Sequence, residues 1–235
     1  MRLGRLVEHD ERSRAYRVAP VTAELRSVRW WRHAPITDQG ELGSCTCEAL
    51  VSAMACTPAY EPVMRRHPRL VLDHRLAERL YRVATQVDAF PGAWPPDDTG
   101  SSGLAACKAA RRAGYVSGYR WGFGLDDTLS ALRAAPVMLG VRWYEGMDAP
   151  SWSGEARVYG SLRGGHEVCL TGIDVDAKRV WFDNSWGEAW GVDGRAWMSW
   201  STLEELLAED GDAVQLVPAV DVATFWQRVR AWLGV

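Results

Sequence analysis

The chain's strongest candidate for a nucleophile is Cys45, which follows Gly43-Ser44 and stands at the start of a predicted helix. The N-terminal end of a helix carries partial positive charge, which lowers the pKa of a nearby thiol. We therefore expect Cys45 to form a reactive thiolate near neutral pH. Because most buried cysteines in helices are inert, this position needs partners elsewhere in the chain before it indicates catalysis.

A histidine and an asparagine further along the chain could supply those partners. His166 follows Gly164-Gly165, and glycines at these positions let a backbone or a substrate come close to the ring. Asn184 lies in the segment Asp-Asn-Ser-Trp-Gly, where its amide could accept a hydrogen bond from the imidazole and hold one tautomer. Trp186 would shield that bond from water. A lone histidine at the start of a strand is more often structural, so the combination carries the hypothesis.

Together these segments resemble the papain-like cysteine peptidases over roughly residues 30 to 217. The segments that carry the resemblance are Trp31-Arg32, Pro35-Ile-Thr-Asp-Gln-Gly40, Gly43-Ser44-Cys45, Gly164-Gly165-His166-Glu-Val and Asn184-Ser-Trp-Gly, then Trp190-Gly191 and Gly194. Their order, Gln, Cys, His and Asn, is the order of the family. His166 and Asn184 follow Cys45 by 121 and 139 residues. The family shows about 130–150, so the histidine comes slightly early, as a shortened loop would make it.

The resemblance implies acyl transfer through a thioester acyl-enzyme. Cys45 and His166 would form a thiolate–imidazolium pair and Asn184 would orient the ring. The Gln39 side chain and the Cys45 backbone N–H would hold the oxyanion. The implied function is a cysteine-type peptidase that hydrolyses peptide bonds, acting on a peptide or protein substrate with no cofactor and no metal. Two alternatives stay open: a catalytically inactive papain-fold module that binds peptides, and a transpeptidase or ligase that uses the same acyl-enzyme.

Three positions depart from the family's pattern. Thr46 stands where the family has an aromatic residue after the nucleophile, and Leu42 stands where it has a disulfide cysteine. Thr99-Gly-Ser-Ser-Gly103, the counterpart of a cleft segment rich in glycine and cysteine, lacks the cysteine. Only about 30 residues precede the mature-like start, so we expect control of activity without the family's long propeptide.

The other thiols and imidazoles are interpreted as structural. Cys47 lies two residues after Cys45 and so faces another side of the helix, which indicates packing, with redox protection of Cys45 as the alternative. Cys-x-Cys with Cys56 has the wrong spacing for zinc. Cys107 and Cys169 have small or apolar neighbours and are predicted to lie in the core. Four histidines have no partner motif and are predicted to be surface or structural residues: His9, His33, His67 and His74.

The composition narrows the function classes. The 235 residues are 47% hydrophobic, and 27 basic against 30 acidic residues give a net charge of −3. These values exclude a disordered chain and a strongly basic nucleic-acid binder. We recognise no targeting signal and no apolar run long enough to span a membrane, so we expect no nucleic-acid partner and no integral membrane segment. Five cysteines, an odd number, fit free thiols in a reducing compartment, so we expect a cytoplasmic protein. Its arginine-rich composition and the lack of a signal fit a bacterial or phage protein.

The elements that must position these residues change type along the chain. Helices are expected over residues 45–56, 73–84, 104–113, 126–134 and, from the capping-box pattern Ser201-Thr-Leu-Glu204, 201–211. Strands are expected over residues 136–144, 166–173, 179–183, 195–200 and 213–217. This order indicates an α+β class with segregated elements. The resemblance implies a two-lobed papain-like fold, with a helical N-terminal lobe, an antiparallel β-barrel-like C-terminal lobe and an active-site cleft between them.

We expect four regions along the chain: a polar arm (1–29), a mainly helical lobe with the nucleophile (30–135), a β-rich lobe with His166 and Asn184 (136–220), and an amphipathic C-terminal helix (221–235). The arm is rich in arginine, and we interpret it as a solvated face, with an anion-binding arm as the alternative. The C-terminal helix would dock on the body or serve as a docking surface for a partner or a membrane.

Overall fold

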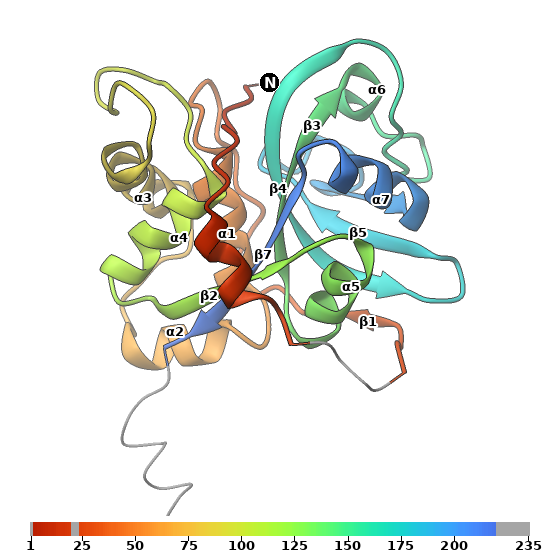
Figure 1. Ribbon diagram of the computed structural model, residues 1–235, viewed down its shortest axis with the longest axis horizontal. Helices are drawn as coiled ribbons and strands as arrows, with labels where there is room; N and C mark the ends of the chain where they lie inside the picture. The colour runs from red at the N-terminus through yellow and green to blue at the C-terminus, as the bar shows by residue number, and fades with distance from the viewer. Residues whose placement is uncertain (1, 20–23, 220–235) are drawn as a thin grey trace, which may run out of the picture.

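The computed structural model describes residues 2–19 and 24–219. In Figure 1 a group of helices lies on one side and an antiparallel sheet with further helices lies on the other. Helices come first and strands follow them along most of the chain, which confirms the α+β class. The predicted amphipathic helix over residues 221–235 lies outside the described residues.

The first half of the chain forms four α-helices and a short 3-10 helix. They are η1 (Glu11–Tyr16), α1 (Cys45–Ala55), α2 (Tyr60–Arg66), α3 (His74–Val87) and α4 (Gly103–Arg112). Two of these helices have an N-cap side chain. Asp73 caps α3 by accepting a hydrogen bond from the Leu76 backbone N–H, and Ser102 caps α4 by accepting one from the Ala105 N–H. Helix α2 was not predicted because Pro62 interrupts its sequence. A proline in the first turn is tolerated, since the N–H it lacks would have no partner within the helix.

Three further helices lie with the sheet: α5 (Leu125–Ala134), α6 (Glu145–Asp148) and α7 (Trp200–Ala208). The capping-box prediction at Ser201 is wrong by two residues. Ser199 is the N-cap, and its hydroxyl accepts from the Thr202 N–H at 3.1 Å. The extended backbone of Ser199 at the end of a strand leaves its side chain free to cap the turn that follows.

The sheet has seven strands in the order β2-β7-β3-β4-β5-β6, with β1 also paired to β4. The strands are β1 (Val28–Arg29), β2 (Val116–Gly122), β3 (Val137–Tyr144), β4 (Leu162–Asp174), β5 (Arg179–Asp183), β6 (Arg195–Ser199) and β7 (Asp212–Pro218). Among the described strands, the end strands β2 and β6 do not pair with each other, so the sheet is open and not closed into a barrel. Strand β2 was not predicted, because glycines at positions 118 and 122 weaken its β pattern.

Both faces of the central strands are buried, which explains why this sheet stays open. Met138, Cys169 and Val214 pack into a core with α1, α3 and α4. The residues directly before or after them in the same strands point to the opposite face and pack into a second core with α5 and α7: Val137, Leu139, Val168, Leu170 and Ala213. Successive side chains of a strand point to opposite faces, so the same strands contribute to both cores. Helices cover each face of the sheet, and the sheet does not close into a barrel.

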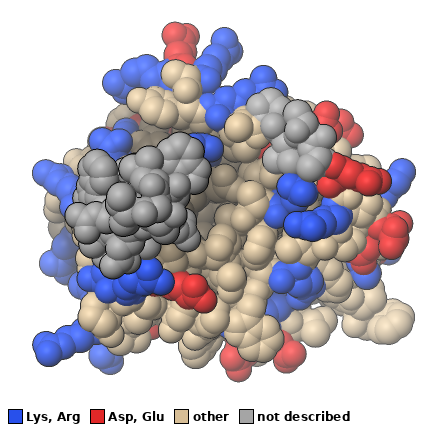
Figure 2. Space-filling model, turned by 90° about the horizontal axis from the view of Figure 1, so that it is seen from below, with Lys and Arg blue, Asp and Glu red and all other residues tan. Residues whose placement is uncertain are grey.

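On the face of the molecule in Figure 2, basic and acidic side chains of the described residues are spread around the rim, with uncharged residues in the centre. No helix among residues 2–19 and 24–219 is both long enough and apolar enough to cross a membrane.

Candidate active site

Cys45 is the first residue of α1, and its side chain is completely buried. The preceding loop is held in place because the Gly43 backbone N–H donates to both carboxylate oxygens of Asp98, at 3.0 and 3.1 Å. Ser44 occupies the N-cap position but makes no side-chain cap; its hydroxyl donates to Glu48 at 3.3 Å instead. The cysteine therefore lies at the positive end of a buried helix, as the sequence predicts.

His166 and Asn184 lie next to each other, although 18 residues separate them in the sequence. The imidazole Nε2 is 2.7 Å from the Asn184 Oδ1, and the same Oδ1 accepts from the Ser185 backbone N–H at 2.8 Å. Because a backbone N–H can only donate, its partner atom is an oxygen, and Nε2 must carry the proton that it shares with Asn184. The Nδ1 atom is then left with a free lone pair. It is buried and has no hydrogen-bond partner among the described residues.

Two tryptophans enclose the imidazole. The Trp186 ring stacks on His166 with 4.6 Å between centroids and 28° between planes. Trp143 meets it edge-on at 4.7 Å and 74°. The His166 side chain is completely buried. Water is therefore kept away from the His166–Asn184 hydrogen bond.

Gln39 links the loop before Cys45 to the asparagine segment. Its backbone N–H donates to the Ser185 carbonyl at 2.9 Å, and its Oε1 accepts from the Ser185 hydroxyl at 2.6 Å. Its Nε2 donates to the Leu42 carbonyl at 2.8 Å, which leaves one amide hydrogen for another acceptor. Gln39, Ser185, Asn184 and His166 thus form one connected network. The sequence did not lead us to Ser185, although it lies between Asn184 and Trp186, two residues that the motif had already indicated.

Residues 2–6, which we call the covering segment, run across this site (Figure 1). The N–H groups of Gly4 and Arg5 donate to the Gly165 carbonyl at 3.2 and 3.1 Å. On the other side, the Ser101 N–H donates to the Gly4 carbonyl and the Leu6 N–H donates to the Ser101 carbonyl, both at 2.8 Å. The covering segment therefore joins the loop before α4 to the glycines before His166, with an isolated β-bridge between Arg5 and Ser101.

Glycines make this close contact feasible. A Cβ atom added at Gly4 would lie 2.1 Å from the Gly43 carbonyl oxygen, and one added at Gly100 would lie 2.3 Å from the Gly4 carbonyl oxygen. A Cβ at Gly165 would lie 2.2 Å from the Arg5 carbonyl oxygen. Two backbones can approach this closely only where side chains are missing on both sides.

Burial sets the protonation states of the two reactive groups. It raises the pKa of Cys45 to about 12, with a further increase from the negative charge of Glu167. Hydrogen bonding from the backbones of Glu167 and Gly4 opposes this increase only in part. Burial also lowers the pKa of His166 to about 4, despite the hydrogen bond to Asn184. The expectation of a low thiol pKa is therefore wrong for this arrangement, because desolvation outweighs the helix dipole.

The structure brings His166, Asn184 and Gln39 into one network and places Cys45 against β4, where the backbone of Glu167 reaches its thiol. No hydrogen bond joins the Cys45 thiol to His166 among the described atoms. Sequence reasoning missed Arg5, which is buried and is not one of the solvated arginines expected of the polar arm. It also missed Glu167, whose signal was a charged residue at the start of the apolar run Val168-Cys-Leu170.

All five cysteines are free and buried. Cys47 lies in the core with α3 and α4, and Cys107 and Cys169 belong to the same core. Three of the four remaining histidines have hydrogen-bond partners: His74 Nδ1 lies 2.6 Å from Glu48 Oε1, His33 Nε2 lies 3.0 Å from Thr57 Oγ1, and His67 Nε2 lies 3.2 Å from the Gly114 carbonyl. Within residues 2–19 and 24–219, no group of three or more His, Cys, Asp and Glu side chains could hold a metal ion.

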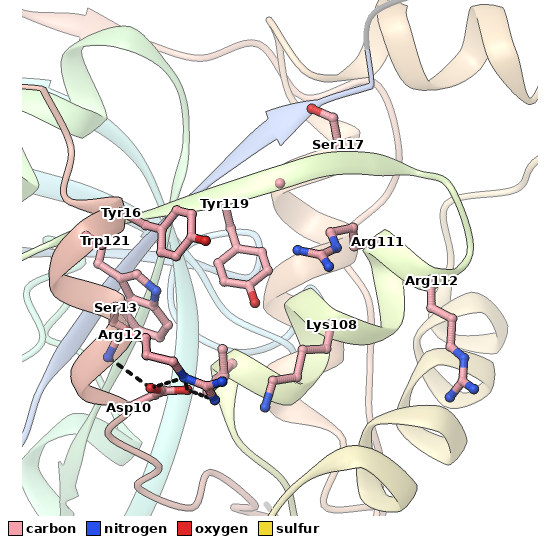
Figure 3. Close-up of a pocket in the computed structure, with 13 residues that line it drawn as sticks. Asp10, Arg12, Ser13, Tyr16, Lys108, Arg111, Arg112, Ser117, Tyr119 and Trp121 are labelled. Atoms are coloured by element: carbon pink, nitrogen blue, oxygen red, sulfur yellow. Dashed lines mark hydrogen bonds and ion pairs between the residues drawn. The ribbon is translucent and has the colours of Figure 1, made fainter.

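A separate cavity of about 850 Å³ lies between η1, α4 and β2 (Figure 3). Lys108 and Arg111 reach toward it from α4, and Tyr16 and Tyr119 line it from η1 and β2. It contains none of the four predicted site residues, so it is distinct from the candidate active site.

No protein-family model matches the sequence, and no curated protein does either. Solved structures do match. Xylellain, a cysteine protease from Xylella fastidiosa, aligns with a TM-score of 0.71 at 17% identity over 92% of this chain and 96% of its own. Procathepsin L 3 of the Tenebrio molitor larval midgut aligns with a TM-score of 0.60 at 14% identity, over 86% and 73%.

The bromelain protease of Ananas comosus, solved with the E64 inhibitor, aligns with a TM-score of 0.57 at 15% identity, over 82% and 98%. At these identities the likeness shows the fold alone. The chain has the fold of the papain-like cysteine proteases, as its motifs predicted.

Proposed function

We propose that this chain, which has the fold of the papain-like cysteine proteases, is a cysteine-type peptidase that hydrolyses peptide bonds through a thioester acyl-enzyme. The observation that carries the proposal is the His166 imidazole, held by Asn184 at 2.7 Å with its Nδ1 lone pair free. A general base needs this state: neutral, oriented and unoccupied at the atom that takes the proton. The position of Cys45 at the start of α1, beside β4, supports it as the nucleophile.

The reaction follows from these roles. The Cys45 proton passes to His166 Nδ1 as the sulfur attacks the peptide carbonyl, and a C–S bond forms. The Cys45 backbone N–H and the free amide hydrogen of Gln39 hold the oxyanion, each worth about 2.7–4 kcal/mol in such sites. His166 then returns its proton to the leaving amine, the C–N bond breaks and a thioester remains. Water, deprotonated by His166, cleaves the thioester and releases the carboxylate and the Cys45 thiol.

Substrate access requires that the covering segment move. Residues 2–6 use the Gly165 carbonyl and the Ser101 backbone groups that a bound peptide would otherwise meet. In the covered arrangement Cys45 and His166 are both neutral, because burial shifts their pKa values in opposite directions. We therefore propose that the covering segment controls the activity and that its displacement hydrates the pair.

The proposed surroundings are a reducing, cytoplasmic compartment and a peptide or protein substrate. Five unpaired cysteines in one chain support the reducing compartment, since oxidising compartments favour disulfides.

Selective labelling of Cys45 tests the proposal. The chain carrying Gly4→Val, which cannot seat the covering segment, is treated with an epoxysuccinyl inhibitor at pH 6, and the label is located by peptide mass mapping. We expect label on Cys45, loss of labelling when His166→Ala is added, and retained labelling when Cys47→Ser is added. At this pH an ordinary cysteine, with a pKa of about 8.5, reacts slowly. An unlabelled Cys45, or equal labelling of several cysteines, would overturn the proposal.

The covered, neutral state of Cys45 and His166 also favours one alternative, an inactive module that binds peptide in the cleft. Turnover of a mixed peptide library by the Gly4→Val variant, followed by mass spectrometry, separates the candidates. Shorter peptides indicate hydrolysis, peptides joined to an added amine indicate a transpeptidase or ligase, and an unchanged library indicates the inactive module.

A further inference from the structure

The covering segment places one charged side chain, Arg5, in a closed pocket next to Cys45. The side chain is completely buried. Its Nη2 donates to the Asp210 carbonyl at 2.7 Å and lies 3.2 Å from an Asp212 carboxylate oxygen. Burying a guanidinium this fully is unfavourable unless opposite charge surrounds it. The pocket is therefore built for a cation.

Three neighbouring strands form the wall of this pocket. Glu167 of β4 is the direct partner of Gly140 in β3, and Gly140 is the direct partner of Asp212 in β7. Direct partners in adjacent strands point to the same face of a sheet. Both carboxylates therefore lie on one face with a glycine between them, on the side where α1 and α4 pack. His166, one residue before Glu167, points to the other face.

Two glycines leave the room that a guanidinium needs. A Cβ atom at Gly140 would lie 2.3 Å from Arg5 Nε and 2.3 Å from Asp212 Oδ1. A Cβ atom at Gly103, the first residue of α4, would lie 2.6 Å from a Glu167 carboxylate oxygen. A larger residue at position 140 would collide with Arg5 and Asp212, and one at position 103 would collide with Glu167.

The pocket keeps more acceptor capacity than Arg5 uses. Both oxygens of Glu167 and the Oδ1 of Asp212 are buried and make no hydrogen bond to any described residue. Burial and the charge of Asp212 raise the pKa of Glu167, and Arg5 opposes that rise. When the covering segment leaves, Glu167 and Asp212 lose the positive charge of Arg5, and another cation in the same place would again oppose the rise in the pKa of Glu167.

We propose that the pocket formed by Glu167, Gly140 and Asp212 selects peptides that carry an arginine close to the bond cleaved at Cys45. The inference rests on the proposed function, because it names the substrate class of that same cleft. Arginine is the cation that the pocket holds in this structure: its Nη2 contacts both the Asp210 carbonyl and the Asp212 carboxylate, and Gly140 leaves room for the guanidinium. Leucine, norleucine and acidic side chains are disfavoured, because they leave buried carboxylates without a partner.

Peptide binding to an inactive full-length chain tests the pocket without turnover. The chain carries Cys45→Ser and Arg5→Ala, and the probe is a fluorescein-labelled peptide with the sequence of residues 1–10. A second probe has citrulline in place of Arg5, which keeps the shape and removes the charge. The chain's own covering segment competes equally with both probes, so the ratio of their Kd values is preserved. We expect the arginine probe to bind at least tenfold more tightly.

Variants of the chain assign the difference to the two carboxylates. Glu167→Gln and Asp212→Asn should each reduce the arginine-to-citrulline ratio several-fold. Asp176→Asn, the same charge change at an exposed position, should leave it unchanged. Thermal unfolding checks that each variant is folded, and if one is not, the ratio of the two Kd values in the chain with both carboxylates intact decides the test. Equal binding of the two probes would overturn the pocket assignment.

Cleavage of a peptide library by the Gly4→Val variant separates this inference from the proposed function. Cleavage with arginine enriched at one position near the cut supports both. Cleavage with no preference for arginine, together with equal binding of the probes, overturns the pocket and leaves the peptidase. Selective binding of the arginine probe without any cleavage supports the pocket and contradicts the peptidase.

Discussion

The protonation of His166 follows from two hydrogen bonds to a single oxygen atom. Ser185 donates its backbone N–H to Asn184 Oδ1 and so fixes which end of the amide faces the ring. The imidazole must then donate from Nε2, and Nδ1 is the atom left for a proton from a thiol. Trp186 and Trp143 keep this arrangement dry. At the scale of residues, the site is a histidine held in one tautomer by contacts that do not involve Cys45.

Replacing Gln39 by alanine tests the proposed oxyanion site. We expect turnover by the Gly4→Val chain to fall about a hundred-fold, because one of two oxyanion donors is lost. Labelling of Cys45 by the epoxysuccinyl inhibitor should persist, since the nucleophile and base remain. Steady-state kinetics and the labelling rate check both expectations. Ser185→Ala removes a hydrogen bond to Gln39 without removing the amide, and so it serves as the control for a merely structural effect.

The buried His166 predicts a stability that falls in acid. Its pKa is lowered to about 4 in the folded chain, from 6.5, by burial. Between these pH values the unfolded chain binds a proton that the folded chain does not, so stability decreases as the pH falls from 6.5 to 4. The full effect is about 3 kcal/mol at about 1.4 kcal/mol per pKa unit. Urea denaturation of the wild type and of His166→Gln at pH 7 and pH 4.5 measures it.

The comparison between those two chains isolates His166, because every other titrating group is common to both. The pH-dependent loss should be smaller in His166→Gln by roughly 2 kcal/mol, most of the full effect, since pH 4.5 is near the end of the titration. Equal losses in the two chains would mean that the folded chain does not hold His166 neutral.

At the scale of elements, the covering segment packs against glycines on both sides. Gly4 meets Gly43 and Gly100, and Arg5 meets Gly165, at distances that only backbone-to-backbone contact permits. The extended segment is held by the Gly165 carbonyl and by the backbone of Ser101. A short segment near the N-terminus can separate from its neighbours without unfolding the core, so we expect it to open at a lower free energy than the core does.

Gly4→Val should release the covering segment and speed the alkylation of Cys45. The Cβ atom of valine would lie 2.1 Å from a carbonyl oxygen, so the segment cannot stay in place. Opening restores water to the thiol, and at pH 6 each unit by which the pKa of Cys45 falls raises the thiolate fraction about tenfold. We expect labelling at least tenfold faster than in the wild type.

Gly118→Val is the matched control for that substitution. Gly118 lies in β2, and a Cβ atom there would meet nothing within 4 Å. Its labelling rate should equal that of the wild type. Equal rates in Gly4→Val and the wild type would show that the covering segment does not limit access to Cys45.

At the scale of the whole molecule, a buried charge cluster joins the helical first part of the chain to the strands β5 and β6. Asp183, at the end of β5, lies 3.0 Å from Arg32 and accepts from the Ser52 hydroxyl of α1 at 3.4 Å. Arg195 of β6 approaches the other carboxylate oxygen at 3.4 Å. The side chains of Arg32 and Asp183 are 6% and 2% exposed, so this pair is not screened by water. The residue immediately after Asp183 is Asn184, so the cluster also anchors the asparagine of the site.

Asp183→Asn should destabilise the whole protein. It leaves the Arg32 guanidinium buried without its counter-charge, which costs about 3–5 kcal/mol in comparable sites. Asp174→Asn removes a partly exposed ion pair with Arg179 and should cost about 1 kcal/mol or less. Urea denaturation curves of both variants and the wild type give the two values. Similar small losses for both would mean that the cluster does not hold the two halves together.

The sequence predicted the main helices and strands, whereas the burial around the candidate site became visible only in the structure. The four helices over residues 45–134 that apolar periodicity predicted are confirmed to within three residues at each end, because the pattern follows from local helix geometry. Strand β4 begins four residues before its predicted start, since glycines at 164 and 165 hid a segment that pairs with β3. Arg5 could not be predicted as buried, because its partner Asp212 lies more than 200 residues away along the chain.

By itself the sequence determined the types of the elements, the α+β class and the four residues that resemble a cysteine-peptidase site. These follow from local propensity and from side-chain chemistry, both of which can be read within short windows. Only the tertiary structure decided that the sheet stays open and that residues 2–6 cover Cys45. It alone decided that Glu167 and Asp212 share one pocket. Each of these depends on burial and on pairing between segments far apart in the chain, where desolvation and cross-strand register, and not local preference, set the outcome.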